Sequence, residues 1–256
     1  MNEILTLLMT SHALVAGQAE AAALVFLRVG AVMATLPAFG ETTIPTRIRL
    51  VLAVMLSAAL FPGVQPMLNG IPLSTGFAPE VAIGLALGLM VRLFVLSLMT
   101  AGSIAANATS LSQLFPAGAE AQPAISKLLV TTGLALAVTA GLHLRVLDYL
   151  LLGYDMLPAG QWPSAGLMAE WGVAQTGRAF AMAFMIAMPF VIASLIYNVA
   201  LGVINRAMPQ LMVTFIGAPA LSFGGLILLA LVSPLALAIW LQSLNSFLVA
   251  PAGPLP

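Results

Sequence analysis

Long apolar stretches, separated by short runs rich in proline, glycine and polar residues, make up most of this sequence. Most of them reach or exceed the roughly 20 residues that a helix needs to cross a bilayer, and the second falls short of that length. The pattern predicts an all-α integral membrane protein with about six hydrophobic helical segments. The stretches cover approximately residues 13–36, 48–61, 80–106, 125–152, 179–204 and 211–249.

Prolines and glycines inside or beside the apolar stretches predict that several helices are kinked or broken. Pro62 and Pro66 are expected to open a loop after the second stretch, because proline lacks a backbone donor and clashes with the preceding turn. The sixth stretch is too long for a single crossing. Gly217, Pro219 and Pro234 are therefore expected to kink it or to split it into a helical hairpin.

The composition strengthens the membrane assignment. Of the 256 residues, 61% are hydrophobic and only 6% are charged, whereas a soluble domain carries about 25% charged residues. The eight basic and eight acidic residues cancel, so no basic surface is available to hold nucleic acid. No internal repeat is evident, and we expect one membrane-embedded domain over residues 1–250 with a short Pro/Gly tail at 251–256.

The sequence offers no candidate residues for catalysis. His12 and His143 are the only histidines, and neither belongs to the His-Glu-x-x-His pair of metalloproteases. The chain has no Gly-x-Ser-x-Gly elbow and no glycine-rich loop followed by lysine for nucleotide phosphates. It also has no cysteine for thiolate ligands. We therefore predict no catalytic, cofactor-binding or metal-binding residue, and we do not expect an enzyme.

Glu80, Gly84 and Gly88 open the third apolar stretch at intervals of four residues. This spacing places all three on one helical face. Glycines on such a face let a second backbone approach closely, and a carboxylate near the start of a helix is stabilised by the helix dipole. The motif predicts close helix packing, either within the chain or with another subunit.

Three further charged residues, Glu20, Arg28 and Arg92, lie inside apolar stretches. An isolated charge in hydrocarbon costs about 2.5–3.5 kcal/mol on insertion scales. These side chains are therefore expected to face protein or water. They either pair with one another or with neighbouring subunits, or they line an aqueous path, and the sequence does not decide which of them form pairs.

A cluster of polar residues and helix breakers lies where the fifth and sixth stretches meet. A lipid-embedded chain keeps such residues only where protein or water receives them. We therefore predict that they take part in helix packing or assembly. The cluster consists of Asn198, Asn205, Arg206, Pro209 and Gln210.

The segment between the third and fourth stretches, residues 107–123, is too polar to lie in lipid. Strongly apolar stretches precede and follow it. It is either a turn at the membrane surface or a re-entrant loop that is buried in protein or lines a cavity.

Four stretches form a pattern that is more specific than any one of them. They are residues 26–50, with Phe-Leu-Arg-Val-Gly and Pro-Thr-Arg-Ile-Arg-Leu; residues 80–102; residues 123–143; and residues 198–219, with Asn-Arg-Ala-Met-Pro-Gln. In their order and spacing they resemble the FliR/SctT family, the R (or T) component of the type III secretion export gate. The resemblance runs over nearly the whole chain, and the flagellar branch is the closer likeness.

The resemblance implies a function that composition alone does not indicate. Family members assemble with the P and Q components into a helical, cone-like gate in the bacterial inner membrane, at the flagellar basal body. The gate passes unfolded flagellar subunits outward, with energy from a separate ATPase and from the proton-motive force acting through a larger membrane partner. The resemblance thus implies a multi-pass protein that meets these gate components, the export substrates and membrane lipid.

The resemblance also implies a role for residues 107–123. The segment matches the region that, in the family, projects into the pore and helps to close it. Apolar side chains there would block water, while flanking polar residues tolerate the lumen. The candidate plug residues are Leu111, Leu114, Phe115 and Pro116.

Three alternative functions stay open. An SctT-like subunit of a virulence type III secretion system is the nearest of them. A secondary transporter for a small solute would also use broken helices and polar residues at mid-membrane, but the sequence has neither inverted repeats nor a convergent coupling carboxylate. The third is a scaffold protein with no passage of its own.

Overall fold

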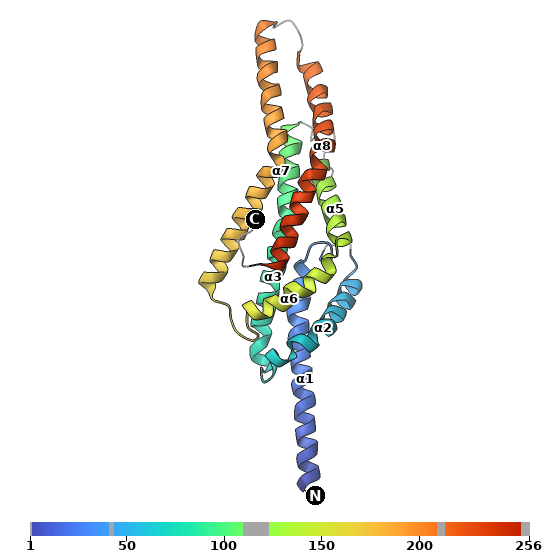
Figure 1. Ribbon diagram of the computed structural model, residues 1–256, viewed down its shortest axis with the longest axis vertical. Coiled ribbons are helices and arrows are strands. Elements are labelled where there is room, and N and C mark those ends of the chain that lie inside the picture. The colour runs from blue at the N-terminus through green and yellow to red at the C-terminus, as the bar shows by residue number, and fades with distance from the viewer. Residues whose placement is uncertain (1, 41–43, 110–122, 209–212, 252–256) are drawn as a thin grey trace. The chain divides into compact units, whose positions relative to one another are not determined.

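The computed structural model describes residues 2–40, 44–109, 123–208 and 213–251. All regular structure in these ranges is helical, which confirms the predicted all-α class (Figure 1). The helices are α1 (Asn2–Thr35), α2 (Thr46–Leu68), α3 (Leu73–Ala108), α5 (Ala124–Thr139), α6 (Leu142–Met156), α7 (Ala165–Ala207) and α8 (Val213–Val249).

Within the described part of the chain, five helices are long and apolar enough to span a membrane. They are α1 from Val15 onward, α2, α3, α7, and α8 from Pro219 onward. The shorter helices α5 and α6 add a sixth span if the two count as one broken crossing. The predicted number of hydrophobic segments is therefore confirmed, although the bounds of several segments differ from the prediction.

Helices α2 and α8 continue through prolines. The expected loop at Pro62 and Pro66 is wrong, because α2 runs through both residues to its end. Of the two alternatives for the sixth stretch, a kink or a hairpin, the hairpin is wrong, because α8 is one helix with Pro219 and Pro234 inside it. Each proline removes one hydrogen bond, but a loop in apolar surroundings would leave many more backbone groups without partners.

Helix α7 starts at Ala165, well before the predicted start near Ala179. The residues in between include Glu170 and Trp171, whose polarity places them outside the apolar stretches in the sequence. Alanine, leucine, methionine, glutamate and glutamine make up much of this segment and are good helix formers. Local helix propensity therefore outweighs the polarity on which the prediction rests.

The fourth stretch is predicted as one segment but forms two helices, α5 and α6, which meet at Ala140 and Gly141. Gly141 has a φ of 87°, in the left-handed region that glycine enters without steric penalty. The glycine thus ends one helix and begins the next inside a continuous apolar run.

The chain clusters into two compact units. Unit 1 comprises residues 1–92, 141–173 and 245–255, and unit 2 comprises residues 93–140, 174–244 and 256. The division falls inside α3, α7 and α8, so each of these helices contributes to both units.

In unit 1, α1 packs against α2, and α2 packs against α6. The fully buried Tyr149 of α6 donates a hydrogen bond from its hydroxyl to the carbonyl of Leu87, at 3.1 Å. The ring of Phe247 lies 5.7 Å from that of Tyr149 and 6.4 Å from that of Trp171, centroid to centroid. Trp171 Nε1 also donates to the carbonyl of Pro251 at 3.0 Å. This cluster joins α6 to the start of α7 and the end of α8.

In unit 2, the second half of α3 packs against α5 and α8. The buried Trp240 of α8 donates a hydrogen bond to the carbonyl of Phe94 at 2.8 Å. Ser126 of α5 donates from its hydroxyl to the carbonyl of Met99 at 3.0 Å. A Cβ at Gly102 would lie only 2.7 Å from the backbone nitrogen of Ser126, so glycine permits this close approach.

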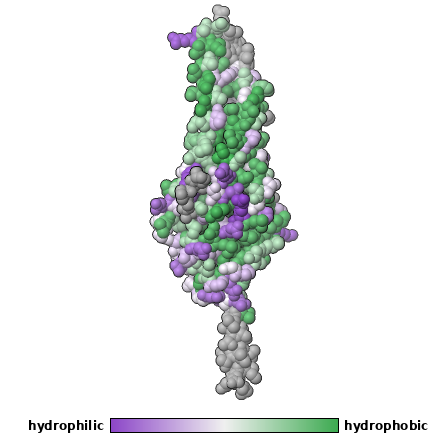
Figure 2. Space-filling view, in the orientation of Figure 1, coloured by the Kyte–Doolittle hydropathy of each residue, from purple (hydrophilic) through white to green (hydrophobic). Residues whose placement is uncertain are grey.

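Helices α7 and α8 run side by side in unit 2 (Figure 1), and each buries a narrow seam. The seam of α7 recurs every three or four residues, at Ala183, Ile186, Phe190 and Ser194. Only 28% of the candidate span in each helix is buried, and Figure 2 shows mostly apolar residues over these helices. Their outer faces therefore need lipid or other protein as a cover. Exposed examples are Phe184, Leu195, Val199, Leu231 and Leu235.

Candidate functional site

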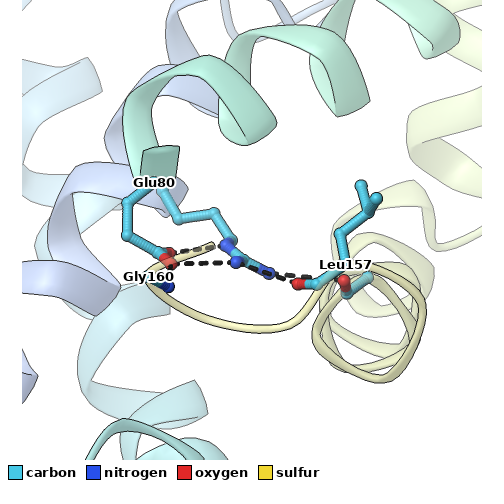
Figure 3. Close-up of polar contacts among 5 residues, drawn as sticks. Glu80, Leu157 and Gly160 are labelled. Atoms are coloured by element: carbon cyan, nitrogen blue, oxygen red, sulfur yellow. Dashed lines mark hydrogen bonds and ion pairs between the residues drawn. The ribbon is translucent and has the colours of Figure 1, made fainter. Parts of the chain in front are cut away.

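A buried ion pair links α1 to α3 in unit 1 (Figure 3). The side chains of Arg28 and Glu80 are both fully buried. Arg28 Nε donates to Glu80 Oε2 at 2.6 Å, and Arg28 Nη2 donates to Glu80 Oε1 at 3.0 Å. Two parallel hydrogen bonds between a guanidinium and a carboxylate combine strength with a fixed orientation.

Arg28 also holds the end of α6. Its Nη1 donates to the carbonyl of Gly153 at 3.3 Å, and its Nη2 donates to the carbonyl of Leu157 at 3.1 Å. Carbonyls at a helix C-terminus lack partners within the helix, and a cation there is favoured by the helix dipole. The ring of Tyr154 covers the guanidinium, with 3.7 Å between Cζ and the ring centroid, which is a cation–π contact.

Glu80 fixes the loop that follows α6. Its Oε1 accepts a hydrogen bond from the backbone N–H of Gly160 at 2.9 Å, and Figure 3 shows the carboxylate beside this loop. Gly160 has a φ of 69°, and a Cβ there would lie 2.7 Å from Ile71 Cγ2. Both the backbone conformation and the lack of space favour glycine at this position.

The structure thus assigns a partner to one of the charges that lie inside the apolar stretches. Arg28 pairs with Glu80, whereas Glu20 and Arg92 are exposed in the isolated chain. Helix α3 starts at Leu73, so Glu80 lies well inside it. The expected stabilisation of Glu80 by the helix dipole is therefore wrong, because that effect is confined to the first turn.

Gly84 and Gly88 lie where α3 meets α1. A Cβ at Gly84 would overlap the carbonyl oxygen of Arg28 and would lie 2.7 Å from the Cβ of Ala31. A Cβ at Gly88 would overlap the hydroxyl of Thr35. Both glycines therefore pack inside this chain, and they let the two backbones approach at the level of the ion pair.

Three of the polar residues predicted for assembly lie on the last turns of α7, in unit 2. Asn198, Asn205 and Arg206 are all exposed in the isolated chain. The hydroxyl of Tyr197, on the same helix, donates to the carbonyl of Gly217 at 2.8 Å. This bond ties α7 to α8, whereas the two asparagines and the arginine stay accessible to a partner.

The other predicted site residues lie outside the described residues. Pro209 and Gln210 follow the end of α7. The candidate plug residues Leu111, Leu114, Phe115 and Pro116 belong to segment 110–122. Their roles stay predictions.

The sequence analysis misses how the buried cluster is assembled. It identifies Arg28 and Glu80 as separate features, and it does not single out Tyr154 or Gly160. The available signal is that the first and third apolar stretches each carry one acidic and one basic residue, so that opposite charges can pair between the two helices. In the described ranges, no three histidine or acidic side chains gather as a metal site requires.

Comparison with known proteins identifies the family. Residues 19–247 match the family described as bacterial export proteins, family 1. The chain belongs to this family. The matched residues of this chain contain the Arg28–Glu80 pair, both packing glycines, all of α7 and almost all of α8.

Similarity to individual proteins confirms the family and the resemblance found in the sequence. Three similar proteins are each named flagellar biosynthetic protein FliR. The one from Caulobacter vibrioides is 34% identical over 222 residues, which cover 84% of this chain and 88% of the relative. The one from Escherichia coli is 31% identical over 218 residues, 82% of each chain. The one from Aquifex aeolicus is 31% identical over 216 residues, 82% of this chain and 84% of the relative.

Proposed function

We propose that this chain is a membrane subunit of the flagellar type III protein export gate and forms part of the channel that passes unfolded flagellar subunits. The similarity to proteins named for flagellar biosynthesis, over 82–88% of the length of the relatives compared above, carries this proposal. The family description as export proteins supports protein passage in particular.

The exposed apolar faces of the helices are typical of a subunit that other proteins cover in an assembly. Only 22% of the span in α2 and 28% of those in α7 and α8 are buried by the chain itself. A solitary carrier would instead enclose a polar path between its own helices. In the described residues, Arg28 and Glu80 satisfy one another in a fully buried cluster and line no open path.

Partners and location follow from the same proposal. The chain lies in the bacterial inner membrane at the flagellar basal body, as a multi-pass protein whose residues 1–250 act as one membrane-embedded domain. Its partners are the P and Q components of the gate, the larger export-gate membrane protein and the unfolded export substrates, with lipid around the remaining surface. It forms a passage and catalyses no reaction.

The predicted site residues divide into two groups in this proposal. Glu80, Gly84 and Gly88 shape unit 1 from within, and the gate depends on them through the packing of α1 and α3. The end of α7 contacts partner subunits directly, through Asn198, Asn205 and Arg206 together with Pro209 and Gln210. Replacing Arg206 by alanine should then reduce swimming, whereas the same change at the exposed Lys127 of α5 serves as the matched control.

A deletion strain tests the proposal. Loss of the chain should abolish both swimming and the secretion of hook and filament subunits into the medium, and a plasmid copy should restore both. Normal swimming in the deletion strain would contradict the flagellar role. Lost secretion of virulence effectors with intact motility would indicate the SctT-like alternative, and a growth defect limited to one small solute would indicate a transporter.

The segment 110–122 is proposed to close the passage. Removing residues 110–120 should let ions and small molecules leak through the assembled gate, because the apolar side chains that block water would be missing. Membrane conductance of cells that carry the shortened chain measures the leak, and co-purification of the other gate components shows whether the gate still assembles. An assembled gate with unchanged conductance would contradict the plug role.

A further inference from the structure

Two polar side chains on α7 lack partners within the described chain. Gln175 is only 4% exposed, and its Nε2 makes no hydrogen bond. Arg178 is half-buried, and it has neither an ion pair nor a hydrogen bond with any described residue. Both residues belong to unit 2.

The two side chains are neighbours on the helix surface. Residues three apart in an α-helix are separated by about 60° around the axis and by less than one turn along it. An amide NH2 and a guanidinium are both hydrogen-bond donors. A single group with acceptor oxygens therefore has the right chemistry to satisfy both Gln175 and Arg178.

Unit 2 has no carboxylate for this role among its described residues. No aspartate or glutamate occurs in its described ranges, 93–109, 123–140, 174–208 and 213–244. The charged residues in these ranges are all basic, namely Lys127, Arg178 and Arg206. The fully buried Arg28 of unit 1, by contrast, is neutralised by Glu80. Among the described residues, Arg28 therefore has a counter-ion, whereas Arg178 has none.

The surface beside the two residues is open to a neighbour. The residues next to Arg178 on the helix surface, Ala174 one turn before it and Ala181 one turn after it, are small and exposed. Small residues let a second helix approach closely. An apolar helix of a neighbouring subunit that packs on this face would bring its side chains next to Arg178.

We propose that Gln175 and Arg178 form the receiving site for a carboxylate side chain on an apolar helix of a neighbouring gate subunit. The carboxylate accepts hydrogen bonds from the Arg178 guanidinium and the Gln175 amide. A lipid phosphate offers similar acceptor oxygens, and photo-cross-linking distinguishes it from a carboxylate of a partner chain. This inference rests on the proposed function as a gate subunit.

Charge variants of the full-length chain, co-expressed with the P and Q components, test the site. Arg178→Glu should reduce their co-purification about tenfold or more, because it places two like charges together. Arg178→Lys should retain most of it. Lys127→Glu makes the same charge change at an exposed position and should have no effect. Equal losses for Arg178→Glu and Lys127→Glu would overturn the proposal.

The thermal stability of the isolated chain distinguishes a partner-binding role of Gln175 and Arg178 from a role in folding the chain itself. Since neither side chain has a partner among the described residues, Arg178→Leu and Gln175→Leu should leave the apparent melting temperature of the isolated chain in detergent unchanged or raised. Both variants should nevertheless weaken co-purification of the partners. A clearly lowered melting temperature would overturn the proposal, because it would reveal a partner inside the chain.

Photo-cross-linking identifies the neighbour directly. A benzoylphenylalanine in place of the exposed Ala174, one turn before Arg178, keeps both proposed donors in place. Cross-links should lead to a partner peptide that contains aspartate or glutamate within an apolar run. Cross-links to lipid alone would overturn the proposal. A deletion strain that fails to swim alongside a fully motile Arg178→Glu strain would leave the gate function intact and reject only this site.

Discussion

The guanidinium of Arg28 and the carboxylate of Glu80 meet between α1 and α3, with 2.6 Å between Nε and Oε2 and neither side chain accessible. Each group alone would be an unpaired charge in an apolar environment. Together they are neutral, and they use their remaining hydrogen-bonding capacity on the end of α6 and the loop after it. The pair therefore joins three helices of unit 1 at one point.

Loss of either partner should be costly. Glu80→Gln or Arg28→Met should each destabilise the chain by about 3–5 kcal/mol, because removal of one partner leaves the other buried and uncompensated. Thermal unfolding in detergent, followed by tryptophan fluorescence, measures the change. The double variant should be less destabilised than the sum of the two, and strict additivity would show that the two groups do not act as a pair.

Exchange of the two charges should not restore stability. A carboxylate at position 28 cannot donate hydrogen bonds to the carbonyls of Gly153 and Leu157, which now receive them from the guanidinium. The combination of Arg28→Glu with Glu80→Arg should therefore unfold at a temperature near that of the single variants. Recovery to the wild-type melting temperature would indicate that the carbonyl contacts contribute little.

Gly84→Ala should loosen the contact between α1 and α3. The added methyl group would overlap the carbonyl oxygen of Arg28, and overpacking of this kind costs about 1–3 kcal/mol. Gly30→Ala is the matched control, because nothing lies within 4 Å of its Cβ position. The control should gain stability by about 0.5–1 kcal/mol from helix propensity alone. Equal behaviour of the two variants would contradict close packing at Gly84.

Gly141→Ala tests the break between α5 and α6. Apart from its chain neighbours, no described residue lies within 4 Å of its Cβ position, so the φ of 87° is the obstacle to a side chain. The substitution should cost about 1–2 kcal/mol through backbone strain. Gly17→Ala, at another open position but within α1, should be neutral or stabilising. A tolerated alanine at position 141 would mean that the break adopts another conformation.

The buried hydroxyl of Tyr154 has no hydrogen-bond partner among the residues that the structure describes, while its ring covers the Arg28 guanidinium. Tyr154→Phe should therefore leave stability unchanged or raise it, because it removes an unsatisfied polar group and keeps the ring. Tyr154→Leu removes the ring as well and should lower the melting temperature. A strong loss in the phenylalanine variant would reveal a partner for the hydroxyl.

Hydrophobic length and periodicity predict the fold class and the number of segments, because lipid leaves few alternatives to helices. They do not predict the helix ends. Pro62 and Pro219 count as breakers in a sequence, yet both lie inside helices because an open loop in apolar surroundings is worse. Gly141 lacks any such signal, since its role depends on a left-handed φ that the sequence does not express.

The buried site is predicted only in part. The charge inside an apolar stretch identifies Arg28 as a candidate residue, and the four-residue spacing identifies Glu80, Gly84 and Gly88. The pairing depends on which helices meet, and that is a tertiary property. Tyr154 gives no sequence signal, because a tyrosine near the end of an apolar helix is common whether or not it covers an arginine.

The single buried seam of α7 has a consequence for how a cell would handle the protein. A copy made in excess of the partners proposed above would leave the outer apolar faces of its helices uncovered, so membrane proteases of the quality-control system should degrade it. Its abundance should therefore follow the supply of the scarcest companion rather than its own rate of synthesis. A pulse-chase experiment should show a shorter half-life of this chain in cells that lack the P component. An unchanged half-life would show that the chain is stable without that component.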